Sequence, residues 1–232
     1  AIKIRANTVI NPYYVGILTA GTSSLEVSGN TVRMRKVNNS NYGIQIQSHD
    51  ATSSANDMLV INNNRILDAN YMGLYIYNTK ANANRRGEVF NNAVSIGYQT
   101  PDCYGMYVYG TTSTSFYHNT VLNNQIGTSN SAGALYFTSN TGARLRNNHF
   151  VVSKVGTMGT PAYLSGNSFT SNAEFNYNNF YRPDTTGNFV YLNSWFSGTA
   201  FKGSLGYNVN SMVIDPKFVS DTLLKTFNGC IN

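Results

Sequence analysis

Apolar and polar positions alternate along short segments that recur about every 29 residues through the chain. Each segment carries an Asn with an apolar residue three positions before it and, in all but the last, another two positions after it. Alternation at period two is typical of half-buried strands, and a fixed period of this length is typical of a solenoid. The repeated residues are Asn7, Asn30, Asn64, Asn92, Asn119, Asn148 and Asn178, with Asn208 as a degenerate eighth.

These apolar positions predict two inward-facing columns. The Asn falls between them, where the chain must bend. Asn tolerates left-handed backbone geometry, and Asn side chains repeated at one level can form a hydrogen-bonded ladder. The first column is Ile4, Val27, Ile61, Val89, Phe116, Leu145, Phe175 and Leu205, and the second is Val9, Val32, Ile66, Val94, Val121, Phe150 and Phe180.

A further strand is predicted in each repeat, in most cases beginning with Gly and then alternating apolar and polar residues. Its first inward residues are Ile17, Ile44, Leu74, Met106, Leu135, Ala162 and Val190. Short strands without an amphipathic helical stretch indicate an all-β fold, a right-handed single-stranded parallel β-helix of about eight coils. At ~4.8 Å for each coil, the rod would be roughly 40 Å long. Leucine-rich and ankyrin repeats would need helices, and a propeller blade would need more residues and antiparallel hairpins.

Residues 1–232 are predicted to form a single parallel β-helix domain, with 208–232 as its C-terminal closing coil. Ala1 begins almost inside the first strand, without a polar cap. Solenoids need caps at open ends, so we expect a fragment or processed part of a larger protein.

Composition favours a secreted or cell-surface protein. Charged residues make up only 11% of the chain, and no apolar run is long enough to insert into a membrane. The formal net charge is +6, but the basic residues are sparse and carry no nucleic-acid-binding motif, so no nucleic-acid partner is expected. Cys103 and Cys230 lie about four coils apart, on the order of 20 Å, so both are expected to be packed thiols rather than a disulfide.

The sharpest candidate site is a stripe of tyrosines at the outward position of the Gly-led strand. Stacked coils would make it a flat aromatic strip with hydroxyls for hydrogen bonding, which suits a polysaccharide or cell-surface glycan. The alternative is that the stripe stabilises the sheet by ~0.2–1 kcal/mol for each contact, or lies under a loop or a neighbouring domain. The stripe is Tyr75, Tyr107, Tyr136, Tyr163 and Tyr191, widened at one end by Tyr77 and Tyr109.

Catalytic residues are harder to find. No two carboxylates are spaced to flank a glycosidic bond. A polysaccharide lyase or epimerase needs a base and a group that stabilises an enolate-like intermediate. His49 and Arg85 are the candidate catalytic residues, with Tyr75 and Arg86 on adjacent coils beside them.

Metal ligands are equally sparse. Asp50 and Asp57, in the loop after the Gly43 strand, are the candidate metal residues. They would be only the start of a calcium site, which needs several converging oxygen atoms. His118 and His149 flank the Asn bends without metal-ligand spacing. No cofactor is expected.

The chain resembles the right-handed parallel β-helix superfamily that includes pectate-lyase-like proteins, over essentially all of its length. Its ending, Asn210 to Val219 with Asp215-Pro216-Lys217-Phe218, followed by Cys230-Ile231-Asn232, looks like that of secreted bacterial surface proteins of the Bacteroidetes type. The superfamily includes lyases, epimerases, hydrolases, phage tailspikes and adhesive or architectural rods. No catalytic signature of a named enzyme family is matched, so the resemblance supplies no active-site residues.

We therefore predict a secreted or surface-displayed β-helix that binds glycan or acts as an adhesin along the tyrosine stripe, and lean against an enzyme. The alternatives are a polysaccharide lyase or epimerase using Tyr75, Tyr107, His49 and Arg85, and a non-binding spacer in a surface filament or secretion cargo. The expected partners are accordingly a glycan or neighbouring domains of the same protein.

Overall fold

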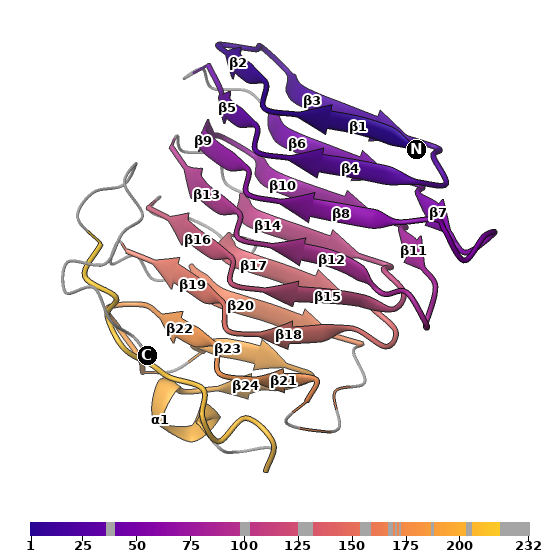
Figure 1. Ribbon diagram of the computed structural model, residues 1–232. Helices are drawn as coiled ribbons and strands as arrows, with labels where there is room; N and C mark the ends of the chain where they lie inside the picture. Colours follow the sequence, from indigo (N-terminus) through magenta and orange to yellow (C-terminus); the bar gives the residue numbers. More distant parts are fainter. Residues whose placement is uncertain are drawn as a thin grey trace.

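The computed structural model is a solenoid of parallel β-strands (Figure 1). The residues that it describes are 1–35, 40–97, 103–124, 132–153, 159–166, 169, 171, 173–186, 188–202 and 206–218. Each complete coil contributes one strand to each of three sheets, which are named A, B and C here in the order in which the chain passes through them.

The bounds of the strands show three strands in each coil, where the sequence indicated at least two. Sheet A contains β1 (Ile2–Arg5), β4 (Leu25–Ser28), β8 (Leu59–Asn62), β12 (Gly87–Phe90), β15 (Thr114–Tyr117), β18 (Arg144–Arg146) and β21 (Phe175–Asn176). Sheet B contains β2 (Thr8–Ile10), β5 (Thr31–Arg33), β9 (Arg65–Ala69), β13 (Ala93–Ile96), β16 (Thr120–Asn123), β19 (His149–Val152) and β22 (Asn179–Tyr181).

Sheet C holds the Gly-led strands of the prediction. They are β3 (Val15–Ala20), β6 (Tyr42–Gln47), β10 (Met72–Tyr77), β14 (Tyr104–Tyr109), β17 (Gly133–Thr138), β20 (Thr160–Ser165) and β23 (Val190–Leu192), followed by antiparallel β24 (Trp195–Phe196). Two short strands, β7 (Asp50–Ala51) and β11 (Lys80–Ala81), pair beside the main sheets, and helix α1 (Gly198–Phe201) follows β24.

The described residues form seven coils rather than the predicted eight, because each sheet has seven parallel strands. After Asn208, the described part of the eighth repeat has no strand of two or more residues, and a bridge joins Asn179 to Met212. The predicted closing coil 208–232 is thus described as far as residue 218, and Cys230 lies outside the described residues.

The predicted asparagine ladder is confirmed. Asn64 illustrates it: its amide nitrogen Nδ2 donates to Asn92 Oδ1 at 2.9 Å and to the Val27 carbonyl at 2.9 Å. The backbone N–H of Asn64 donates to the same Oδ1 at 3.1 Å. Asn64 is buried, so the ladder satisfies polar groups that the bend between sheets A and B removes from water.

The left-handed backbone conformation lies one residue earlier than the prediction implied. The residue that precedes each ladder Asn, rather than the Asn itself, has positive φ. Most of these residues are Asn, Gly or Ala, and the exceptions are His118 and Tyr177, at φ of 56° and 57°. A second left-handed position recurs where the strands of sheet C end, for example at Ser48 and Asn78.

The inward columns fill the interior of the coil. Val27, Ile61, Val89 and Leu145 are fully buried in sheet A, and Phe150 stacks on Phe180 in sheet B with centroids 5.6 Å apart. Close packing also explains the glycine at the start of the sheet C strands. A Cβ atom on Gly73 would lie 2.3 Å from Val94 Cγ1 and 2.5 Å from the carbonyl oxygen of Gly105, closer than atoms pack.

Candidate functional site

The predicted tyrosine stripe forms a stacked ladder on the outer face of sheet C. Its five rings, from Tyr75 to Tyr191, occupy one register column of five successive coils and are half-buried. Successive ring centroids from Tyr75 through Tyr107, Tyr136 and Tyr163 to Tyr191 lie 5.2, 4.5, 5.3 and 4.4 Å apart, with planes within 19° of each other. We call these five residues the tyrosine ladder.

Stacking changes what the ladder presents to solvent. Each internal ring lies face to face with two neighbours, so its faces are covered and its edge and hydroxyl remain accessible. Tyr42 packs edge-on against Tyr75 at 5.4 Å, and Trp195 packs edge-on against Tyr191 at 5.2 Å, so other aromatic rings contact both ends of the ladder. The surface is therefore a row of phenol hydroxyls and ring edges, not the expected strip of open aromatic faces.

A second, shorter column widens the ladder as predicted. Tyr77 and Tyr109 stack at 5.2 Å, and Tyr77 lies parallel to Tyr75 at 5.9 Å. In the preceding coil the positions of Tyr75 and Tyr77 are occupied by Gln45 and Gln47, whose side chains hydrogen-bond at 3.3 Å.

The hydroxyls of Tyr107 and Tyr163 stay protonated at neutral pH. Burial raises the pKa of Tyr107, followed in size by the influence of the neighbouring phenols of Tyr136 and Tyr75. Burial is also the main cause of the raised pKa of Tyr163, ahead of its neighbour Tyr191. Neutral phenols can both donate and accept hydrogen bonds, which is the chemistry that a sugar hydroxyl needs.

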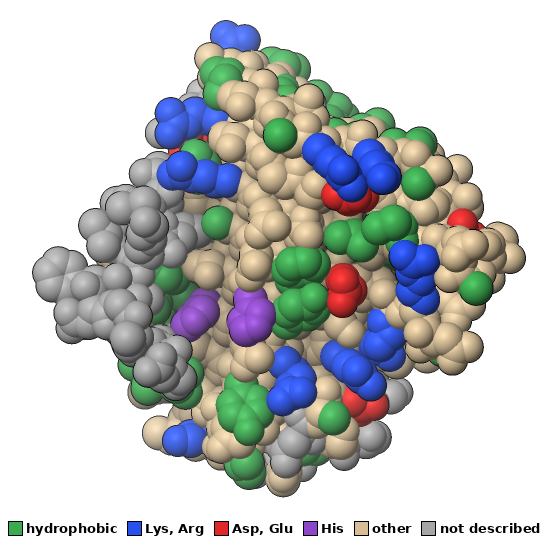
Figure 2. Space-filling model, viewed as in Figure 1, with side chains coloured by type: hydrophobic (Ala, Val, Ile, Leu, Met, Phe, Trp, Pro, Cys, Tyr) green, Lys and Arg blue, Asp and Glu red, His purple; other side chains and the backbone are tan. Residues whose placement is uncertain are grey.

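The structure also shows a hollowed surface that the sequence did not indicate, which we call the basic groove. It lies on the outer face of sheet A, at the bend into sheet B, and consists of two hollows of about 530 and 360 Å³ that meet at His118 and Asn147. Figure 2 shows this face, where two histidines lie side by side among basic and apolar side chains. Its basic and imidazole residues are Arg86, Arg144, Arg146, Lys202, His118 and His149.

Carboxylate and aromatic side chains complete the groove. Tyr117 stacks on Phe90 at 4.9 Å and donates a hydrogen bond from its hydroxyl to Glu88 Oε1 at 3.2 Å. Burial, followed by the charge of Glu88, raises the pKa of Tyr117 to about 12. Tyr177 lies beneath the guanidinium of Arg146, with 5.4 Å from Cζ to the ring centroid.

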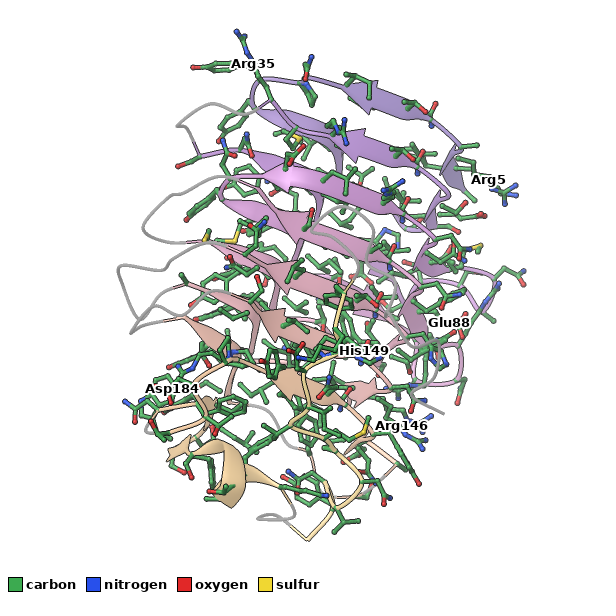
Figure 3. The ribbon with its side chains drawn as sticks, turned by 90° about the vertical axis from the view of Figure 1, so that its left-hand side faces the viewer. Arg5, Arg35, Glu88, Arg146, His149 and Asp184 are labelled. Atoms are coloured by element: carbon green, nitrogen blue, oxygen red, sulfur yellow. The ribbon has the colours of Figure 1, made fainter. Side chains whose placement is uncertain are left out.

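Burial and a neighbouring histidine both act on His149. Burial lowers the pKa of His149, and His118 lowers it further, so His149 is neutral at pH 7. Its Nδ1 is buried without a hydrogen-bond partner in the described part of the chain. Figure 3 labels His149 together with Arg146 and Glu88 on this part of the solenoid.

Comparison with protein families identifies the architecture. The model of the right-handed β-helix region matches residues 1–126, more than half of the chain. The chain belongs to the right-handed β-helix family. Neither the curated proteins nor the solved structures contain a significant match to it.

The predicted catalytic pair has structural partners in this β-helix. His49 is buried, at 1% exposed, in the turn after β6, and its Nδ1 lies 2.6 Å from Thr22 Oγ1. Arg85 is exposed and donates to the carbonyl oxygens of Ala55 and Asn56 at 3.4 and 3.0 Å. Tyr75 belongs to the ladder, so the described contacts do not bring these side chains to one reacting centre.

Asp50 and Asp57, the predicted metal residues, form hydrogen bonds within their own loop. Asp50 Oδ1 accepts hydrogen bonds from the backbone and hydroxyl of Thr52, and Asp57 Oδ2 accepts one from the backbone of Ser54. Within the described ranges of the β-helix, no three His, Cys, Asp or Glu residues gather into a metal site. The described helix is also too short to cross a membrane.

One signal for the basic groove was present in the sequence. His118 and Tyr177 occupy the position before the ladder Asn, where other coils have Asn, Gly or Ala.

Cys103 fits its expected role as a packed thiol, because it is buried and Asn123 Nδ2 donates to its Sγ at 3.5 Å.

Proposed function

We propose that this β-helix is a secreted or surface-displayed protein that binds a polysaccharide or another cell-surface glycan along the tyrosine ladder. The observation that carries the proposal is the register of Tyr75, Tyr107, Tyr136, Tyr163 and Tyr191, which line up across five coils of sheet C.

The spacing of the ladder supports this ligand. Adjacent strands lie ~4.8 Å apart, so the hydroxyls recur at an interval comparable to the length of one sugar unit. A chain of sugars lying along the solenoid axis would meet a donor and acceptor at each step. Gln45 and Gln47 extend the polar row by one coil.

The covered ring faces define how the glycan would be held. Because Tyr107 and Tyr136 are stacked with planes 8° apart, a sugar ring cannot lie flat on either face. Hydrogen bonds to the hydroxyls and contacts with the ring edges would supply the affinity. Each neutral hydrogen bond contributes about 1 kcal/mol, so binding depends on several adjacent rungs.

A non-enzymatic role agrees with the placement of the predicted catalytic residues. The burial of His49 removes it from the surface that would hold a substrate. Composition supports the compartment, since only 11% of residues are charged while neutral polar residues and tyrosine are abundant.

The test is retention by immobilised polysaccharides and titration calorimetry with the best ligand. The double variant Tyr107→Phe/Tyr136→Phe keeps the stacked rings and removes two hydroxyls. Loss of two hydrogen bonds of about 1 kcal/mol each predicts affinity weaker by roughly 30-fold. Tyr181→Phe, which removes a hydroxyl from sheet B, is the control and should bind as wild type. Equal affinity of the double variant and wild type would overturn the proposal.

A further inference from the structure

We propose that the basic groove binds an acidic sugar unit through its carboxylate or sulfate group, at a site separate from the tyrosine ladder. The groove lies over sheet A and its bend into sheet B, whereas the ladder lies on sheet C. The two sites therefore occupy different faces of the solenoid.

The first argument is the placement of two arginines on one short strand. Arg144 and Arg146 are both on β18, two residues apart, and both line the groove. Side chains two apart on a strand project from the same face of a sheet. The planar guanidinium presents paired N–H donors that match a carboxylate or sulfate.

One of these donors has capacity for a ligand. Nε of Arg146 is buried and has no hydrogen-bond partner in the described part of the protein. Leaving such a group unpaired is costly, and an oxyanion would satisfy it. Arg86, by contrast, is already held by Ser115 Oγ at 3.0 Å and by the carbonyl of Gly142, so it shapes the wall of the groove.

Charge balance favours an anion in spite of one carboxylate in the lining. Arg86, Arg144, Arg146 and Lys202 line the two hollows, against Glu88. A second negative charge, that of Glu174, interacts electrostatically with Arg86, although Glu174 does not itself line the groove. The hydroxyl of Tyr117 donates a hydrogen bond to Glu88 Oε1, so part of that carboxylate is already paired.

Aromatic rings indicate that the anion is carried on a sugar. Tyr117 and Tyr177 line the adjoining hollows, and apolar ring surface beside hydrogen-bonding groups suits the mixed surface of a saccharide. A bare inorganic ion would gain nothing from these rings.

Backbone strain points to the same surface. His118 and Tyr177 adopt left-handed φ values of 56° and 57°, at positions where Gly or Asn is less strained. In other coils this position holds Asn, Gly or Ala, and strained backbone conformations cluster at functional sites. Both side chains line the hollow of about 530 Å³.

Calorimetry with matched oligosaccharides tests this proposal on the full chain. The probes are a neutral galactan oligosaccharide, an oligogalacturonate, a sulfated galactan oligosaccharide, and inorganic sulfate and phosphate. We expect an acidic oligosaccharide to bind at least tenfold more tightly than the neutral one and than the inorganic ions. The uronate and sulfate arms identify which oxyanion the groove accepts.

Arg144→Gln/Arg146→Gln should weaken this binding at least tenfold. Lys3→Gln is the control, because Lys3 lies in the same outward column of sheet A as Arg144 but at the far end of the sheet. Removing its positive charge should leave binding of the acidic oligosaccharide unchanged. Tyr107→Phe/Tyr136→Phe should also leave it unchanged, which separates failure of this site from failure of the ladder. Thermal unfolding would confirm that each variant is folded.

Three results would overturn the proposal. The first is equal binding of acidic oligosaccharide by Arg144→Gln/Arg146→Gln and by wild type. The second is equal affinity for neutral and acidic oligosaccharides. The third is equal affinity for inorganic sulfate or phosphate and for the acidic oligosaccharide, which would mean that the site recognises only the ion.

Discussion

Tyr107 and Tyr136 lie face to face on the outer surface of sheet C, with ring centroids 4.5 Å apart and planes 8° apart. Parallel pairing of β14 and β17 fixes this relationship, because it places the two residues directly opposite one another. The same geometry both stabilises the sheet and orients the hydroxyls outward, so structural and binding roles can be separated only by substitutions that affect one of them.

Removing a ring from the ladder should destabilise the protein, whereas removing its hydroxyl should not. Tyr136 stacks on Tyr107 and Tyr163, and aromatic pairs contribute about 0.5–1.5 kcal/mol each beyond their buried area. We expect Tyr136→Ala to lower the free energy of unfolding by about 2 kcal/mol, and Tyr136→Phe to lower it by less than about 0.5 kcal/mol. Urea denaturation measures both, and equal losses would show that stacking does not stabilise the sheet.

Substitution of a ladder asparagine should lower the free energy of unfolding most in the middle of the ladder. Asn92 Oδ1 accepts hydrogen bonds from the backbone and side chain of Asn64, and its Nδ2 donates to the Ile61 carbonyl and Asn119 Oδ1. Asn92→Leu leaves several buried groups unpaired, so we expect a loss of about 4 kcal/mol in the free energy of unfolding.

The matched control is Asn7→Leu at the exposed end of the same ladder. Asn7 donates from its side chain to Arg5 and Asn30, and we expect its loss to cost about 1 kcal/mol. Similar chemical denaturation curves for the two variants would contradict the role assigned to burial of the ladder.

A methyl group at Gly73 should disturb the contact between sheets B and C. Its Cβ would lie 2.3 Å from Val94 Cγ1 and 2.5 Å from the Gly105 carbonyl, and the second of these is backbone. We expect Gly73→Ala to cost about 3 kcal/mol, as over-packing of cores does. Ala134→Gly, two coils further along this column, should cost no more than about 1 kcal/mol by thermal unfolding.

Acid should destabilise the fold through His49. Burial lowers its pKa below the ordinary 6.5, although Asp50 and Asp57 act in the opposite direction. The unfolded chain therefore binds this proton more tightly than the folded protein does. The stabilising contribution is fully present above pH 6.5 and is lost as the pH falls through the lower folded pKa.

The variant His49→Asn tests this dependence. His49 and Asn140 occupy the same turn in different coils, because each directly precedes a residue of the column Asp50, Lys80, Thr112 and Thr141. Asn140 accepts hydrogen bonds from Thr111, just as His49 contacts Thr22. Unfolding free energies measured between pH 7 and 5 should decline less steeply in this variant, by up to about 1.4 kcal/mol for each pH unit. His149, whose pKa burial also lowers, would maintain part of the decline. An unchanged slope would show that His49 does not contribute.

The repeat predicted the fold because each column of equivalent residues has one structural role: to fill the core, to pair at the bend, or to face solvent. Val27 and Val32 face inward on either side of Asn30, and their period gave the sheets, the ladder and the outward tyrosines. The covering of the ring faces was not predictable, because the torsion of each Tyr side chain depends on its neighbours in the stacked coils.

The basic groove escaped prediction for a different reason. Its residues come from separate columns of several coils: Arg146 on β18, His149 on β19, and His118 and Tyr177 at bends. None of these residues forms a motif along the chain. The winding of the coils brings them to one hollow. The one signal in the sequence was a His and a Tyr at the position before the ladder Asn, where the other coils have Asn, Gly or Ala.

The most direct test of glycan binding by the ladder is NMR of the protein labelled with ¹³C in its tyrosine rings, titrated with the bound oligosaccharide. Our account predicts that the ring signals of Tyr107, Tyr136 and Tyr163 shift together with ligand concentration, while those of Tyr181 on sheet B stay in place. Saturable binding that leaves the three ladder signals unmoved would contradict it.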